Sequence, residues 1–139
     1  MGGFLLDTNV VSELRRPEPD DGVSRWFEHV NSVDLFLSVL VTGEIRRGIE
    51  RLRPREPERA RALAGWLDGL LETHARRVLP VTQPVADAWG RLSATRPLPA
   101  IDGLLVATAA VHELVFVTRE ADRLTDLGVE VLNPWRIVS

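Results

Sequence analysis

The 139-residue sequence contains no cysteine and no lysine. The lack of cysteine excludes disulfides, thiolate metal sites and cysteine nucleophiles, and it agrees with a reducing compartment. All 17 cationic residues are arginines. The lack of lysine excludes the phosphate-binding lysine of P-loop proteins, Schiff-base chemistry and the lysine of many aspartate-based phosphoryl-transfer sites. A formal net charge of −3 argues against a general binder of polyanions.

Long apolar segments are also missing. The longest one, residues 104–111, is far shorter than the roughly 20 residues of a membrane span. Residues 4–6 form the only apolar run before Asp7, which is too short for the core of a signal peptide. We therefore expect a cytoplasmic protein without membrane contact. A hydrophobic content of 45% fits one domain over residues 1–139.

Five short apolar runs predict strands that are buried on both faces, at 4–6, 35–39, 78–81, 115–117 and 129–132. Helical patterns lie between them. One opens near Pro57 and closes with Arg76 and Arg77, and another follows a predicted N-cap at Thr82. This alternation predicts an α/β fold, a three-layer α/β/α sandwich around a mainly parallel sheet of about five strands.

Two further features bear on packing. The helical pattern at 102–112 is almost uniformly apolar, so this helix is either buried or faces a partner chain. The tryptophans sit beside apolar neighbours, which favours core or interface anchors over base-stacking platforms.

Acidic residues follow the predicted strands where the strands end. Asp7 directly follows the first strand, and Glu44 lies in the first turns of the helix after the second. Asp102 opens a helix that runs into the strand at 115–117, so its N-terminus returns to the same sheet edge. Residues 118–122 bring a fourth acid there. Asp7 and Glu44 also have a plain structural interpretation, as a helix cap and a partner of the helix dipole.

Four carboxylates at one edge repel one another unless a cation lies between them. Oxygen ligands without nearby histidine or cysteine suit Mg²⁺ or Mn²⁺, which lower the pKa of a bound water and so create a nucleophile. Paired ions could hold the attacking and leaving oxygens of phosphodiester hydrolysis. The sequence therefore predicts a divalent-metal site.

Separated blocks of the chain carry a family resemblance. They are LLDTNVVSE at 5–13, SVLVTGEI at 38–45 with GI at 48–49, DGLLVATA at 102–109 and VTR at 117–119, with NPW at 133–135. In this order they resemble the PIN domain, and within it the VapC/FitB-type toxins of type II toxin–antitoxin systems. The resemblance implies a Mg²⁺-dependent endoribonuclease, usually a dimer. It also implies neutralisation by a small VapB/FitA-like antitoxin whose C-terminal segment enters the active-site groove.

The resemblance also implies roles for individual residues. Asp7, Glu44 and Asp102 match the family's catalytic, metal-binding acids. Short polar side chains around the first acid and ahead of the last acid are expected to orient ligands or contact phosphate: Thr8, Asn9, Ser12 and Thr118.

The last block departs from the family pattern. Relatives commonly carry Thr-Arg-Asn, two variable residues and Asp-Phe, whereas here Glu120 stands at the Asn position and Arg123 at the Asp position. Either Asp122 supplies the fourth catalytic and metal-binding acid, or Glu120 substitutes for it, or the site uses three acids. We predict Asp122.

Contact with RNA requires cations. Arg15, Arg16 and Arg119 lie close to the site blocks and are predicted RNA contacts. The arginine-rich stretch 46–61 is interleaved with glutamates, which favours a solvated face of ion pairs there.

Other classes of protein also place an aspartate after the first strand of a parallel sheet. Haloacid-dehalogenase-like phosphatases and response-regulator receivers both need a lysine, and the phosphatases need an acid where this chain has Asn9. Three alternatives stay open: the proposed ribonuclease, a metal-dependent nuclease acting on DNA, and a catalytically silent binding module. The apolar helix offers a surface for a homodimer.

Overall fold

The computed structural model describes residues 2–137, which contain a five-stranded sheet with every neighbouring pair parallel. The strands are β1 (Phe4–Leu6), β2 (Leu35–Ser38), β3 (Val78–Leu79), β4 (Val115–Val117) and β5 (Val131–Leu132). The α-helices are α1 (Thr8–Arg15), α2 (Asp21–His29), α3 (Val39–Leu52), α4 (Pro57–Thr73), α5 (Gln83–Thr95) and α6 (Ala100–His112). Short 3₁₀ turns complete the chain: η1 (Ser32–Asp34), η2 (Ala75–Arg77), η3 (Ala121–Leu124) and η4 (Pro134–Arg136).

The strand order β3-β2-β1-β4-β5 contains a reversal beside β1. The chain adds β2 and β3 on one side of β1, crosses through α5 and α6, and adds β4 and β5 on the other side. At such a switch point, a crevice opens beyond the carboxyl ends of the strands. The parallel register pairs Leu6 with Val117, so β1 and β4 end level with each other.

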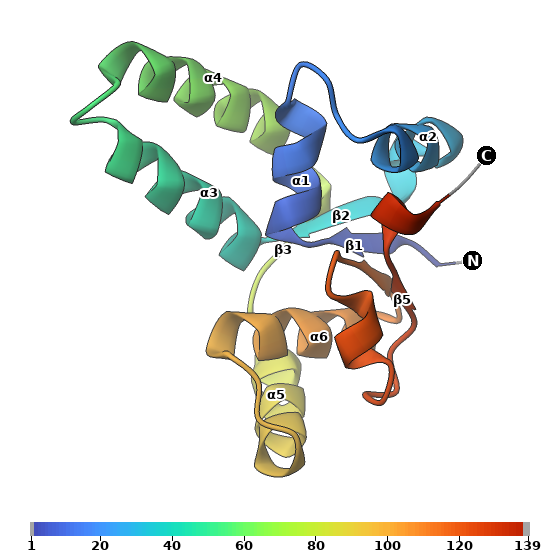
Figure 1. The fold of residues 1–139 in the computed structure, drawn as a ribbon. Coiled ribbons are helices and arrows are strands. Elements are labelled where there is room, and N and C mark those ends of the chain that lie inside the picture. Colours follow the sequence, from blue (N-terminus) through green and yellow to red (C-terminus); the bar gives the residue numbers. More distant parts are fainter. Residues whose placement is uncertain (1, 138–139) are drawn as a thin grey trace.

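Helices cover both faces of this sheet, which confirms the predicted α/β/α sandwich. Figure 1 shows α1, α3 and α4 on one side and the α5–α6 pair on the other. The apolar α6 is buried within the fold along residues 105–109. A Cβ atom at Gly103 would lie 3.0 Å from the Trp89 ring, so this glycine permits the close approach of α5 to the start of α6.

Several predicted boundaries shift by a few residues. The second strand ends at Ser38 and not at Val39, because the Ser38 hydroxyl accepts a hydrogen bond from the Leu40 amide and caps α3. The third and fifth strands each span two residues. Helix α4 ends at Thr73, and the predicted last turn is the separate turn η2, where the Arg77 guanidinium donates to the Leu35 carbonyl oxygen.

The core lies between the sheet and both helix layers. Fully buried side chains from β1, β4, α1 and α6 form its centre, including Leu5, Phe116, Val10 and Leu105. Trp26 of α2 is also buried and packs edge-on against the Phe4 ring at 5.3 Å. Among the helices of residues 2–137, none combines the length and apolarity that a membrane crossing requires.

Candidate active site

Asp7 stands at the switch point, directly after β1. Its amide donates to the Val117 carbonyl oxygen at 2.9 Å, which extends the β1–β4 pairing by one residue. One carboxylate oxygen accepts from the Thr8 amide at 2.8 Å and caps α1. The other accepts from the Thr118 hydroxyl at 2.8 Å, across the reversal. Asp7 therefore caps α1, and its carboxylate is also held in place by the hydroxyl of Thr118, the residue directly after β4.

Glu44 reaches the same place from α3. Because Ser38 ends β2 and caps α3, the first turns of this helix rise from the carboxyl edge of the sheet. The Thr8 hydroxyl donates to Glu44 Oε1 at 2.5 Å, which joins α1 to α3. Thr8 thus touches Asp7 through its amide and Glu44 through its hydroxyl.

Asp102 lies in the first turn of α6 and is exposed to solvent. The N-terminal end of α6 lies at the carboxyl edge of β4, as the sequence predicts. Together with Asp7 and Glu44 it lines an open cavity of about 470 Å³. The full lining consists of Asp7, Thr8, Asn9, Glu44, Arg47, Gly48, Arg51, Asp102, Glu120 and Arg123.

This cavity is lined by acids but is no preformed metal cage. Within residues 2–137, no three histidine, aspartate or glutamate side chains are gathered closely enough to hold one metal ion. Mg²⁺ keeps several of its waters and commonly takes only one or two carboxylates from the protein. The donor set of Asp7, Glu44 and Asp102 suits such an ion, because it offers only oxygen ligands and these carry negative charge.

The carboxylates of the cavity affect one another's ionisation. Burial raises the pKa of Asp7 above its usual value, and the charges of Asp102 and Glu44 raise it further, against the opposing hydrogen bonds from Thr118 and Thr8. Partial desolvation by neighbouring groups and the Glu44 charge also raise the pKa of Asp102, while the nearby Arg123 charge lowers it. A cation bound between these groups would relieve the repulsion.

The raised pKa of Asp7 predicts how stability depends on pH in the metal-free protein. In the folded state Asp7 binds its proton more tightly than in the unfolded state, so the folded state loses stability as pH rises from the usual aspartate range through the raised value. In thermal melts with EDTA, Asp7→Asn is therefore expected to have a higher Tm than the wild type near pH 7. This difference should shrink as the pH falls toward about 4. A constant difference over that range would contradict the proposed cause.

The structure places Asp122, the predicted fourth acid, outside the lining of the acidic cavity. Asp122 lies in η3, is exposed, and forms an ion pair with Arg136 at 2.6 Å outside the cavity. Glu120 instead lines the cavity, and its amide donates to the Thr118 hydroxyl at 3.1 Å. Because η3 begins at Ala121, Asp122 lies within this turn, where its side chain is exposed to solvent.

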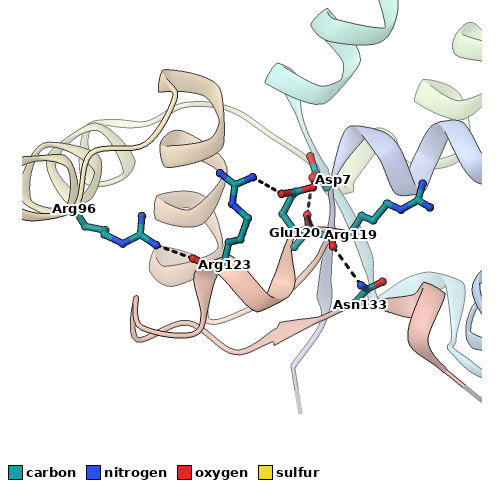
Figure 2. A network of polar contacts seen from close by, with 7 residues as sticks. Asp7, Arg96, Arg119, Glu120, Arg123 and Asn133 are labelled. Carbon is teal, nitrogen blue, oxygen red and sulfur yellow. Dashed lines mark hydrogen bonds and ion pairs between the residues drawn. The ribbon is translucent and has the colours of Figure 1, made fainter.

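The predicted polar and RNA-contacting residues divide between several places. Asn9 lines the acidic cavity, whereas Ser12 and Arg15 line an adjoining groove of about 390 Å³ between α1, α3 and α4. Arg16 pairs with the buried Glu13 at 3.3 Å. Arg119 stacks on the Trp135 ring at 4.7 Å and points away from Asp7 (Figure 2).

Two arginines of α3 reach the cavity although the arginine-rich stretch was interpreted as a solvated face. Arg46, Arg53, Arg59 and Arg61 do form ion pairs with acids on α3, on α4 or at the N-cap of α4. Arg47 and Arg51, however, line the cavity. Helical spacing carries the signal for them, since they stand three and seven residues after Glu44 on one face of α3.

A family model described as the PIN domain matches residues 4–129. The chain belongs to the PIN domain family. This confirms the family predicted from the sequence blocks, and it agrees with acids gathered at the switch point of a parallel sheet.

Individual relatives match nearly the whole length of this chain. Toxin FitB of Neisseria gonorrhoeae is 33% identical over 95% of this chain and 98% of its own length. VapC ribonuclease Y4jK of Sinorhizobium fredii is 31% identical over 95% of this chain and 97% of its own. The crystal structure of FitAcB from N. gonorrhoeae superposes with a TM-score of 0.87 at 33% identity, covering 96% of this chain and 99% of that one.

Proposed function

We propose that this PIN domain is a Mg²⁺-dependent endoribonuclease and the toxin of a type II toxin–antitoxin system. One observation carries the proposal: Asp7, Glu44 and Asp102 come from three separate segments and line one cavity at the switch point of the sheet. The similarity to a VapC ribonuclease supports RNA as the substrate, and the similarity to toxin FitB supports a role as a toxin. This function places the protein in the cytoplasm, where its RNA substrate is found.

Asp7, Glu44 and Asp102 would hold Mg²⁺, or Mn²⁺ in its place, because the site offers only oxygen ligands and these carboxylates repel one another. When bound, the ion supplies positive charge to the phosphate and acidifies an attacking water. The hydroxyls of Thr118 and Thr8 hold Asp7 and Glu44 in fixed orientations.

The other side chains of the cavity supply contacts for the substrate. Arg47 and Arg51 line the side of the cavity formed by α3, where their guanidinium groups would bind the RNA backbone. Asn9 offers an amide that can contact phosphate or orient a water. Arg15 lines the adjoining groove, from which it would contact RNA beyond the cleaved bond.

An antitoxin would regulate the site by covering it. Similar solved structures include FitAcB and a complex of FitAB bound to a DNA fragment, which is 30% identical to this chain with a TM-score of 0.87. We therefore propose a VapB/FitA-like partner for this chain and a homodimer of the chain within the complex. The acidic cavity would receive a cationic segment of that partner.

Expression in a bacterial host tests this function. With the chain alone, we expect growth arrest and discrete new RNA 5′ ends. With the small protein encoded directly upstream, we expect growth to recover and the new ends to disappear. Normal growth with unchanged RNA ends, at a verified level of soluble protein, would favour the silent binding module. New ends in DNA instead of RNA would favour the DNA nuclease.

A further inference from the structure

Arg123 of η3 lines the acidic cavity, which Arg47 and Arg51 of α3 also line. It lines both the cavity that contains Asp7, Glu44 and Asp102 and the smaller pocket that contains Asp7, Asp102 and Thr118. The side chain is 70% exposed. Arg123 is therefore both next to the carboxylates and open to an incoming ligand.

The backbone of Arg123 is fixed from a distant element. Arg96, which caps the end of α5, donates from Nη2 to the Arg123 carbonyl oxygen at 2.7 Å (Figure 2). Arg96 also forms an ion pair with Asp126 at 3.0 Å. Within η3, Ala121 and Leu124 are buried on either side of the exposed Arg123. This anchoring holds the backbone while the guanidinium remains at the surface.

The guanidinium is only partly engaged. Its Nη1 donates to Glu120 Oε1 at 2.5 Å, and within residues 2–137 no other side-chain hydrogen bond of Arg123 is formed. A guanidinium carries five N–H donors in a planar fork, which matches the oxygens of a phosphate. Exposed ion pairs such as this one contribute little stability, so Glu120 can be exchanged for another anion at low cost.

The charge of Arg123 acts on the site itself. It lowers the pKa of Asp102 and so partly offsets the raising effects of partial desolvation, Glu44 and Glu120. Arg123 also stands where the family resemblance would place an aspartate. At that position the chain has a cation where its relatives commonly have an acid.

We propose that Arg123 is a catalytic residue that binds the RNA phosphate at the cavity, and that Glu120 holds its guanidinium there until the phosphate replaces Glu120. This inference rests on the proposed ribonuclease function. In the absence of RNA, Glu120 is the ion-pair partner of Arg123. The substrate phosphate is thereby contacted from η3 as well as from α3.

Steady-state cleavage of an RNA oligonucleotide with Mg²⁺ tests the assignment. Because hydrogen bonds to charged groups are the stronger ones, Arg123→Ala is expected to raise KM about 10- to 100-fold with a much smaller change in kcat. Arg123→Lys should raise KM less than Arg123→Ala does, since lysine keeps the positive charge but lacks the planar set of guanidinium N–H donors. Arg61→Ala is the matched control, because Arg61 is an exposed arginine in an i,i+3 pair with Glu58 at 2.9 Å and lies outside the cavity.

Glu120→Gln provides an independent arm that keeps Arg123 in place. Without its ion-pair partner the guanidinium is more available, so KM for RNA should fall. A rise in KM for Glu120→Gln, or equal KM values for Arg123→Ala and Arg61→Ala beside normal wild-type cleavage, would overturn the inference alone. Wild-type protein that cleaves no RNA would overturn the proposed function and the inference with it.

Discussion

Replacement of Asp7 or Asp102 by Asn is expected to lower Mg²⁺-dependent RNA cleavage by at least about 10³-fold, since a metal ion contributes several kcal/mol to stabilising transition-state charge. Both residues line the acidic cavity, and their carboxylates repel each other in the absence of a cation. Asparagine keeps the shape of the side chain but removes its charge. Cleavage rates of purified variants at saturating Mg²⁺ measure the effect.

The matched control for these variants is Asp87→Asn. Asp87 is an exposed aspartate of α5 that pairs with Arg91 at 3.2 Å and lies outside the cavity. Its replacement should leave cleavage unchanged. Full activity in Asp7→Asn or Asp102→Asn, with a melting temperature showing a folded protein, would remove these residues from the site.

Replacement of Thr118 by Val is expected to weaken Mg²⁺ affinity about 10- to 100-fold, the usual effect of removing a hydrogen bond to a metal ligand. Thr118 is fully buried, and its hydroxyl both donates to Asp7 at 2.8 Å and accepts from the Glu120 amide at 3.1 Å. Valine has nearly the same shape but no hydroxyl. The Asp7 carboxylate would lose one of the two hydrogen bonds that orient it.

Titration of cleavage and of Tm with Mg²⁺ measures this affinity. Thr108→Val is the control, because Thr108 is equally buried but its hydroxyl donates to the Leu104 carbonyl oxygen within α6 at 2.7 Å. Both variants should lose some stability, and only Thr118→Val should need more Mg²⁺. The same Mg²⁺ dependence in the two variants would show that Thr118 has a structural role only.

Much of the fold could be predicted from the sequence because buried parallel strands and amphipathic helices have simple patterns. The apolar runs at 4–6 and 115–117 coincide with β1 and β4. Strand ends were less predictable where side chains set them. Ser38 ends β2 by capping α3, and apolarity alone gives no sign of this at Val39. The strand order depends on long-range pairing, which local patterns do not contain.

The site shows the same division. Asp7, Glu44 and Asp102 could be placed together because each lies near the start of a helix that begins at the carboxyl edge of the sheet. Asp122 and Glu120 could not be distinguished, because they stand two residues apart and a 3₁₀ turn decides which one faces the cavity. The ion pair between Asp122 and Arg136 joins η3 to η4, a tertiary contact that local sequence patterns do not contain.

We propose that RNA is cleaved in the acidic cavity with the help of a divalent metal ion. The most direct test of this proposal incubates wild-type protein with an end-labelled RNA and the matched DNA, each with Mg²⁺ and with EDTA, and resolves the products by length. We predict discrete fragments from RNA with Mg²⁺, none with EDTA, and intact DNA throughout. RNA cleavage that persists in EDTA, or DNA cleaved as readily as RNA, would contradict this account.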